Sequence, residues 1–306
     1  SFPTRRSSDL FIFISAGSQV KAQYYFYNGE YYQNDIVFEV GGSLGVMNCL
    51  TDLGGRKGIG KKFVKDFNLK NTMFCGTMFF SAVWKNQIAI RLEATSGHVQ
   101  AYDSILKNVK DNSEERYYRN LSFRSPISEI MLVAEFHPFY ILGNYDEDHY
   151  PPAVSPYVLA GIGYFHFNPQ AYLNGNWVDL QPLHTEGEGF SEYPNVKEYK
   201  LSQFNFPIGI GARYDISPLL NVRAEIVTRI LQTDYLDDVS GRYINPAVFA
   251  NHLSGIQLQD ALLLNNRAKP GAETAHTGGI RGNPKNNDSY LTFNLKLGLT
   301  IGRGRR

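Results

Sequence analysis

The segment SYLTFNLKLGLTIG, residues 289–302, sets the fold class of this 306-residue chain. Phe293 and Leu295 alternate in it with Asn294 and Lys296. Successive side chains of a β-strand point to opposite faces, so this period of two predicts a strand with one apolar and one polar face. The segment also exceeds the roughly ten residues that a tilted strand needs to cross a bilayer.

The same alternation recurs along the chain, most clearly in QIAIRLEA at 87–94 and NVRAEIVTRIL at 221–231. An even number of such strands suits a closed transmembrane barrel, which pairs every backbone donor and acceptor and leaves no edge. The sequence therefore predicts an all-β fold, an eight-stranded antiparallel transmembrane barrel of the outer membrane. Together with weaker segments, the alternation places the eight strands near residues 35–48, 70–84, 87–97, 122–137, 156–167, 199–214, 219–235 and 289–302.

The connections between these segments favour the barrel over a soluble β-sandwich. Short links at 85–87 and 215–218 alternate with long polar loops, and the loop at 236–288 spans about fifty residues, far beyond ordinary soluble connections. Outer-membrane barrels have this asymmetry, with short periplasmic turns and long extracellular loops. One link, at 140–155, is a longer turn on the expected periplasmic side.

The composition agrees with a strand-rich membrane protein. The chain carries 20 Tyr, 20 Phe and 28 Gly and has no apolar run long enough for a membrane helix. Its net charge of +1 gives no indication of a nucleic-acid partner. Aromatic residues near the strand ends predict two interfacial belts, a periplasmic one of Trp84, Phe136, Phe139, Tyr157 and Tyr214 and an outer one of Phe74, Phe123, Phe165, Phe167, Tyr199, Tyr235 and Tyr290.

The polar faces of the strands are expected to line the inside of the barrel. Eight strands leave an interior just wide enough for side chains, so we expect the charged residues there to form a paired, hydrogen-bonded plug. A proton or ion path is the functional alternative, but a buried network of opposite charges usually serves structure. The expected lumen residues are Glu39, Arg91, Glu93, Glu129, Glu135, Arg213, Arg223, Glu225, Arg229 and Lys296.

No spacing in the sequence marks a catalytic, metal or cofactor site, so we expect a protein without enzymatic activity or cofactor. A lipid-modifying hydrolase that uses a histidine such as His137 or His166 remains the alternative. The turn DEDH at 146–149 could hold a hard cation, but it lacks the regular spacing of a calcium loop and is typical of a solvated turn. Cys49 and Cys75 are expected to be free thiols, with a bridge across their loop as the alternative.

The N-terminal residues are not expected to belong to the folded domain. When SFPTRRSSDL at 1–10 is reverse-translated, it reads as a common short-read sequencing adaptor in frame; the basic region of a signal peptide is the alternative. The apolar run that follows indicates a residual signal peptide at 11–22. The remaining residues, 23–306, are predicted to form a single barrel domain.

Several segments resemble one family of small outer-membrane barrels. They are VGGSLGVMNCLTDLGG at 40–55, PYVLAGIGYFHFNPQA at 156–171, FPIGIGARYDI at 206–216 and TDYLDDVSGRY at 233–243. In these segments the chain resembles the PorG-like component of the type IX secretion system. The resemblance extends from residue 23 to about residue 302.

The resemblance implies a barrel that ties a periplasmic ring to the outer membrane. That ring is built from a PorK-like lipoprotein and a PorN-like protein, so the expected partners are these two proteins and outer-membrane lipid. Such an anchor needs no catalytic residue. The rivals are a stand-alone structural or adhesive barrel that acts through its extracellular loops, and a small pore. The turn at 140–155 offers contact surface on the correct side, with Tyr140, Asp146, Glu147, Asp148 and His149 as candidate contacts.

Overall fold

A computed structural model of the chain describes residues 35–54, 68–107, 114–143 and 154–301. The expectations for residues 1–10 and 11–22 fall outside these ranges. Within them, β-strands dominate and the helices are short. No helix in the described ranges is long and apolar enough to cross a membrane.

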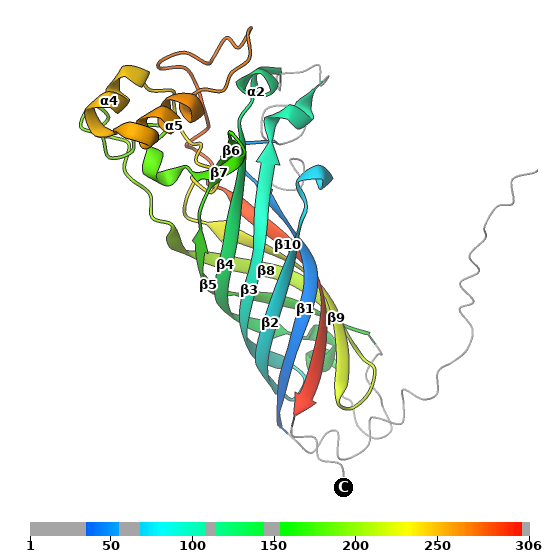
Figure 1. Cartoon of the computed structure of the whole chain (residues 1–306). Helices are drawn as coiled ribbons and strands as arrows, with labels where there is room; N and C mark the ends of the chain where they lie inside the picture. Colours follow the sequence, from blue (N-terminus) through cyan, green and yellow to red (C-terminus); the bar gives the residue numbers. More distant parts are fainter. Residues whose placement is uncertain (1–34, 55–67, 108–113, 144–153, 302–306) are drawn as a thin grey trace, which may run out of the picture.

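Eight of the strands form one closed antiparallel barrel (Figure 1). Each is hydrogen-bonded on both sides, in the order β1, β2, β3, β4, β5, β8, β9, β10, and β10 returns to β1. This confirms the predicted fold class. The barrel strands are β1 (Ile36–Leu50), β2 (Met73–Trp84), β3 (Ile88–Tyr102), β4 (Ser122–Phe136), β5 (Val154–Phe167), β8 (Ser202–Asp215), β9 (Leu220–Leu231) and β10 (Ser289–Ile301).

The predicted strands agree with the structure to within a few residues. The larger differences lie at extracellular ends, where β3 continues to Tyr102, past the predicted end at residue 97, and β9 ends at Leu231 rather than at 235. β3 and β4 stay paired as far as Tyr102 and Ser122. The wall of the barrel is therefore longer on this side than the alternation of the sequence indicates.

The alternation of the sequence becomes the two faces of the barrel wall. Leu295 points outward and is 61% exposed, whereas its chain neighbours Asn294 and Lys296 are buried inside. A closed wall leaves no unpaired edge, and an apolar outer face suits the hydrocarbon of a bilayer. The protein is therefore a barrel of the outer membrane, and its eight barrel strands are the membrane-spanning segments.

The short links lie at the periplasmic end of the barrel. Between β2 and β3, Lys85 and Asn86 have positive φ angles of 49° and 56°. The Gln87 amide donates a hydrogen bond to the Trp84 carbonyl at 2.9 Å. Positive φ at both central positions is typical of a type I′ turn, whose twist matches that of two antiparallel strands.

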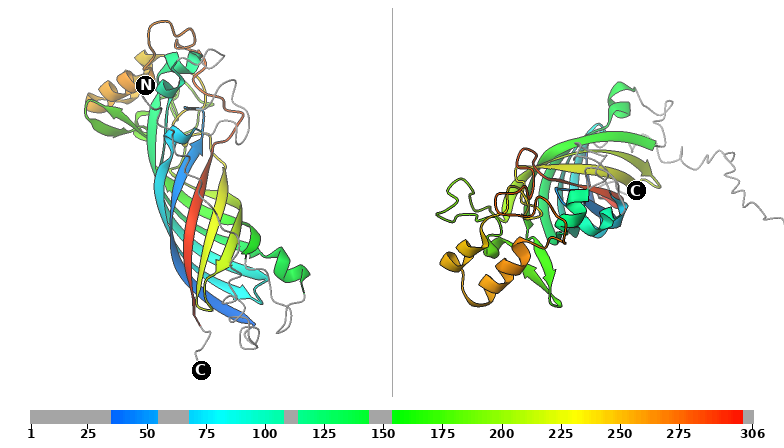
Figure 2. Two further views of the ribbon diagram at one scale, coloured as in Figure 1. Left: turned by 90° about the vertical axis from the view of Figure 1, so that its right-hand side faces the viewer. Right: turned by 90° about the horizontal axis from the view of Figure 1, so that it is seen from above.

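Two long connections, 168–201 and 236–288, fold together at the extracellular end as a unit that we call the head (Figures 1 and 2). It contains a hairpin of β6 (Gln170–Leu173) and β7 (Asn176–Asp179) and the helices α4 (Phe249–His252) and α5 (Gly255–Asn265). The residue pattern of these two loops indicates none of these elements. The head has an apolar core of its own, formed by Ala171, Leu180, Leu183, Phe190, Ile244, Phe249, Ala261 and Leu264.

Candidate functional site

The ten charged residues expected in the lumen all lie inside the barrel. Each is at most 4% exposed. Five are glutamates and five are arginines or lysine, so the set is electrically neutral. They are Glu39, Arg91, Glu93, Glu129, Glu135, Arg213, Arg223, Glu225, Arg229 and Lys296.

Glu135 is the centre of the larger charged network. It accepts hydrogen bonds from Arg91 and from Arg223, whose Nη1 lies 3.0 Å from Oε2. Nε2 of His137 lies 3.4 Å from the same Oε2. Glu135 belongs to β4, Arg91 to β3 and Arg223 to β9, so this carboxylate ties opposite walls of the barrel together across the lumen.

Glu225 joins the same network from β9. It accepts hydrogen bonds from Nη2 of Arg91 at 2.8 Å and from the Tyr157 hydroxyl at 2.9 Å, and it lies 3.1 Å from Nζ of Lys296. Lys296 also pairs with Glu93, which lies 2.8 Å from Nε of Arg91. Every charge in this group thus has at least two partners of opposite sign, as buried ions require.

Glu39 extends the network toward the periplasmic end. Its carboxylate lies 2.8 Å from Nη2 of Arg213 and pairs with Arg223. The Asn221 amide donates to it at 3.2 Å and the Ser81 hydroxyl at 3.4 Å. Neutral donors therefore satisfy the acceptor capacity that the arginines leave open.

A separate pair, Arg229 and Glu129, lies nearer the extracellular end. Nε and Nη2 of Arg229 are 3.2 and 3.0 Å from Oε2 of Glu129. The Tyr290 hydroxyl and the Asn205 amide donate to Oε1 at 2.9 and 2.7 Å, and the Thr292 hydroxyl accepts from Arg229. Both ionic side chains are fully buried, so their charges are compensated by protein groups alone.

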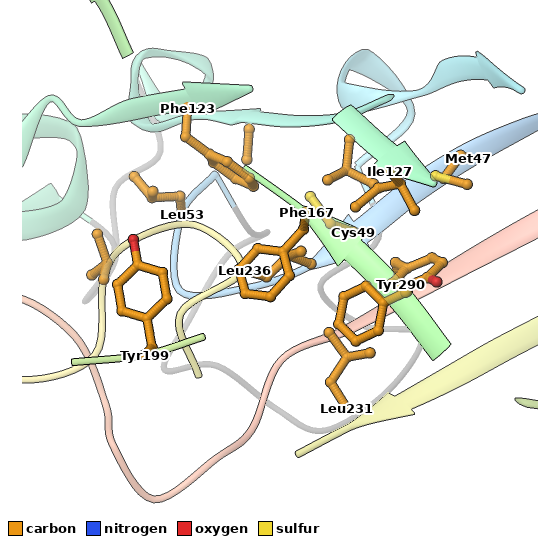
Figure 3. Close-up of a cluster of buried hydrophobic side chains, with 14 of the residues drawn as sticks. Met47, Cys49, Leu53, Phe123, Ile127, Phe167, Tyr199, Leu231, Leu236 and Tyr290 are labelled. Atoms are coloured by element: carbon orange, nitrogen blue, oxygen red, sulfur yellow. The ribbon is translucent and has the colours of Figure 1, made fainter. Parts of the chain in front are cut away.

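An apolar cluster fills the barrel on the extracellular side of this pair (Figure 3). Phe123 and Phe167 enter it from the wall, and Leu53 and Leu236 enter it from the segments that follow β1 and β9. Tyr290 links the two layers, because its ring belongs to the cluster and its hydroxyl reaches Glu129. Side chains therefore fill the interior in two layers, one charged and one apolar, as expected for eight strands.

Several aromatic residues predicted for the interfacial belts point into the barrel instead. Phe74, Trp84 and Phe136 are 86%, 46% and 47% exposed on the outer wall, as a belt requires. Nearness to a strand end indicates how close a residue lies to the membrane surface, but the pleat of the strand decides whether its side chain points outward or into the barrel. The prediction is wrong for six buried residues: Phe123, Tyr157, Phe165, Phe167, Tyr199 and Tyr290.

Glu135, His137 and Ser155 form a chain of contacts in the order that serine hydrolases use. Nδ1 of His137 lies 3.3 Å from the Ser155 hydroxyl, and Nε2 lies 3.4 Å from Glu135. All three are at most 3% exposed, and the rings of Tyr140 and Tyr157 pack on His137 at 6.4 and 5.0 Å between centroids. Because Ser155 is buried, a substrate cannot reach its hydroxyl. We therefore interpret Glu135, His137 and Ser155 as structural members of the charged network.

A second group of buried charges lies within the head. Arg281 lies 3.0 Å from Glu186 and 3.8 Å from Asp238. Asp238 also accepts hydrogen bonds from the hydroxyls of Thr185 and Tyr199, both at 2.6 Å. These contacts hold the two connections of the head against each other.

Residues 234–238 and Asp288, where the head joins β9 and β10, carry four buried aspartates. Burial, reinforced by the neighbouring charge of Asp237, raises the pKa of Asp234 to about 9, and burial raises the pKa of Asp238 to about 6. Burial also raises the pKa of Asp237 and of Asp288 well above the usual range. Within the described residues, no three His, Cys, Asp or Glu side chains are arranged to hold a metal ion. These four carboxyl groups therefore stay protonated to a higher pH than free aspartates do.

Cys49 and Cys75 are both buried free thiols. The sulfur of Cys49 lies 3.4 Å from the carbonyl of Gln100, whereas the sulfur of Cys75 lies 3.6 Å from the side-chain oxygen of Asn294. The two thiols thus have different neighbours inside the barrel.

Of the candidate periplasmic contacts, only Tyr140 falls within the described residues; Asp146, Glu147, Asp148 and His149 lie outside them. Tyr140 belongs to the short helix α3 (Pro138–Leu142) and is 7% exposed. The helix folds back on the end of the barrel. There the side-chain amide of Gln87 donates a hydrogen bond to the backbone carbonyl of Tyr140 at 3.2 Å. The tyrosine ring is therefore buried, contrary to its expected role as a contact.

The closed barrel, its apolar outer wall and its filled interior define the class: an integral β-barrel of the outer membrane. No protein-family model matches the chain, and neither does any curated protein.

Solved structures similar to the chain include three bacterial surface or membrane proteins. Ail, the attachment invasion locus protein of Yersinia pestis, is 9% identical over 87% of this chain and 97% of its own, with a TM-score of 0.34. Neisserial surface protein A is 9% identical over 86% and 95%, with a TM-score of 0.36. A major outer membrane protein from Thermus thermophilus is 12% identical over 88% and 100%, with a TM-score of 0.36.

Proposed function

We propose that the protein is a non-enzymatic membrane anchor, which fixes a periplasmic ring of the type IX secretion machinery to the outer membrane. The filled interior supports an anchor over a conduit, because neutral charge pairs and an apolar layer occupy the space through which a solute would pass. The assignment to the secretion machinery is supported by the resemblance of the segments at 40–55 and 233–243 to PorG-like barrels.

The observation that carries the anchor role is the apolar surface of α3 at the periplasmic rim. Phe139, Ile141 and Leu142 are 44%, 36% and 85% exposed, while Tyr140 of the same helix holds it against the barrel. A helix held by one buried residue presents its other side chains in a fixed orientation, which lowers the entropy cost of binding. The periplasmic ring proteins are the partners that we assign to this surface.

The test is a cross-linked pull-down of the tagged protein from native outer membranes, with mass spectrometry of the captured proteins. The wild type should recover a PorK-like lipoprotein and a PorN-like protein. Phe139→Ser/Leu142→Ser should lose both while the barrel remains inserted. Leu262→Ser/Leu263→Ser on the head is the matched control and should recover the same proteins as the wild type.

Equal recovery of the ring proteins by the α3 variant would contradict a contact through α3. Failure of the wild type to capture any ring protein would reject the anchor role and leave α3 as an interfacial anchor in the lipid headgroups.

A second candidate is a binding role for the head. The observation that favours it is an apolar surface on α5, where Ile256, Leu262 and Leu263 are 76%, 45% and 51% exposed. Exposed apolar groups of this size on a folded unit mark interaction sites. An adhesive barrel should lose cell attachment in the variant Leu262→Ser/Leu263→Ser, whereas a ring anchor should keep secretion.

A further inference from the structure

The outer wall of the barrel carries a groove of about 680 Å³ that runs across β1 to β5. Its floor is low because the outward residues Gly76, Ala94, Ser96 and Ser128 are small. Met78, which borders it, is 75% exposed and stands out from the wall. The groove therefore results from a block of small side chains between large ones.

Strand register divides the groove into an apolar row and a polar row. One row of paired outward positions runs from Met78 to Ala94, Ile130 and Tyr164, and is apolar apart from the tyrosine hydroxyl. The next row toward the head carries small and polar side chains instead, namely Gly76, Ser96, Ser128, His166 and Ser202. The groove therefore has an apolar part and, on the side of the head, a polar part.

The polar part is lined by the hydroxyls of Ser96 and Ser128 and the imidazole of His166. Nδ1 of His166 lies 2.9 Å from the Ser202 hydroxyl. Farther along the same face, His98 on β3 is exposed, and on β4 the guanidinium of Arg124 stacks on Trp177 with its carbon 4.0 Å from the ring centroid.

On the described strands β1 to β5, the charged side chain that faces outward is Arg124. In the described strands β1 to β5, no outward-facing side chain is a carboxylate. Nε of Arg124 is buried and has no hydrogen-bond partner among the described residues. An anionic headgroup at this level would thus meet hydroxyls and the guanidinium of Arg124. The carboxylate of Asp179, on the β6–β7 hairpin, is linked to that guanidinium through the side chain of Gln170.

We propose that this groove is a binding site for lipid A of the outer leaflet. One acyl chain lies along Met78 and Ile130, and a phosphate of the headgroup faces the side on which His98 and Arg124 lie. A groove on the membrane-facing wall is filled by lipid, and the guanidinium of Arg124 favours an anionic one. Lipid A is the assigned source because the groove lies at the same end of the barrel as the head, in the outer leaflet.

The test uses the refolded barrel in nanodiscs of phosphatidylcholine that contain lipid A, with mass spectrometry of the lipid retained after gentle delipidation. Ser96→Leu/Ser128→Leu fills the groove and should lower the retention of lipid A about tenfold. Ala224→Leu adds the same side chain to the outward face of β9, away from the groove, and should retain as much as the wild type. Heat-modifiable mobility in gels confirms that each variant is folded.

Headgroup recognition has its own variant. His98→Gln/Arg124→Gln should keep the retention of dephosphorylated lipid A and lose the preference for the phosphorylated form. Equal retention by the filled-groove variant and the wild type would overturn the site. Preferential retention of phosphatidylglycerol over lipid A would overturn the assigned lipid, and a wild type that retains neither lipid would overturn the proposal as a whole.

Discussion

Replacing Arg229 by methionine tests whether the charges inside the barrel are shielded from water. The side chain makes a two-pronged contact with Glu129 at 3.0 and 3.2 Å, and both partners are 0% exposed in their side chains. After Arg229→Met, the carboxylate keeps only the neutral donors Tyr290 and Asn205. Breaking one side of a buried pair costs about 3–5 kcal/mol, because the other charge stays buried without its counterion.

The double variant Arg229→Met/Glu129→Met removes both charges and should cost no more than either single variant. The coupling energy from the double-mutant cycle is expected to be about 3 kcal/mol. Equilibrium urea unfolding in phospholipid vesicles measures it, with Trp84 as the reporter in a Trp177→Phe background. Thr228→Met, the neighbouring residue in the chain, is the control and should leave the free energy of unfolding within about 0.5 kcal/mol of the wild type.

Additive single effects of under about 1 kcal/mol each would contradict this expectation. They would show that Arg229 and Glu129 behave as a solvated surface pair, for which such small values are typical. The lumen would then contain water, which would contradict the conclusion that side chains fill it.

Three further predictions concern the interior, the head and the thiols. Refolded wild-type protein should show no steady single-channel currents in planar bilayers, whereas Phe165→Ala/Phe167→Ala combined with Arg91→Ala should produce openings; steady wild-type currents would contradict the filled lumen. The raised pKa values of Asp238 in the head and of Asp234 just before it mean that the folded protein binds protons here more tightly than the unfolded chain does. The stability of this region is therefore full below the unfolded pKa near 4 and falls as the pH rises through about 6 and 9. Hydrogen exchange of 236–288, corrected for its intrinsic pH dependence, should therefore accelerate between about pH 5 and 9, and Asp234→Asn should flatten the upper part of the curve. Cys49 and Cys75 should react with a maleimide only after unfolding, and rapid labelling of the folded barrel would contradict their burial.

The interior charges show how far residue patterns alone can lead. Alternation along β3 and β9 was enough to assign Arg91, Arg223 and Glu225 to one face, because the pleat turns every second side chain to the same side. Their partners could not be assigned in the same way. Arg229 and Glu129 are 100 positions apart, and only the closure of the barrel brings them into contact.

The head shows where local patterns fail. Its loops were predicted to be long and polar, yet Phe190 and Phe249 bury themselves in one apolar core together with Leu264. These side chains are scattered over two connections with no common period, so neither a strand nor a helix signal marks them. The core exists only because β5, β8, β9 and β10 bring the two connections to the same end of the barrel.

Residue patterns were sufficient to predict the wall of the barrel. They indicate the eight strands, the approximate bounds of these strands, the alternation of short and long links, and the charged face of each strand. These are local properties, because the period of two and the length of a strand are set within a dozen residues. The folded barrel was needed to show which charges pair, which aromatic residues point inward, and that the loops fold into a head. Those features depend on strand register and on contacts between distant segments, and both arise when the barrel closes.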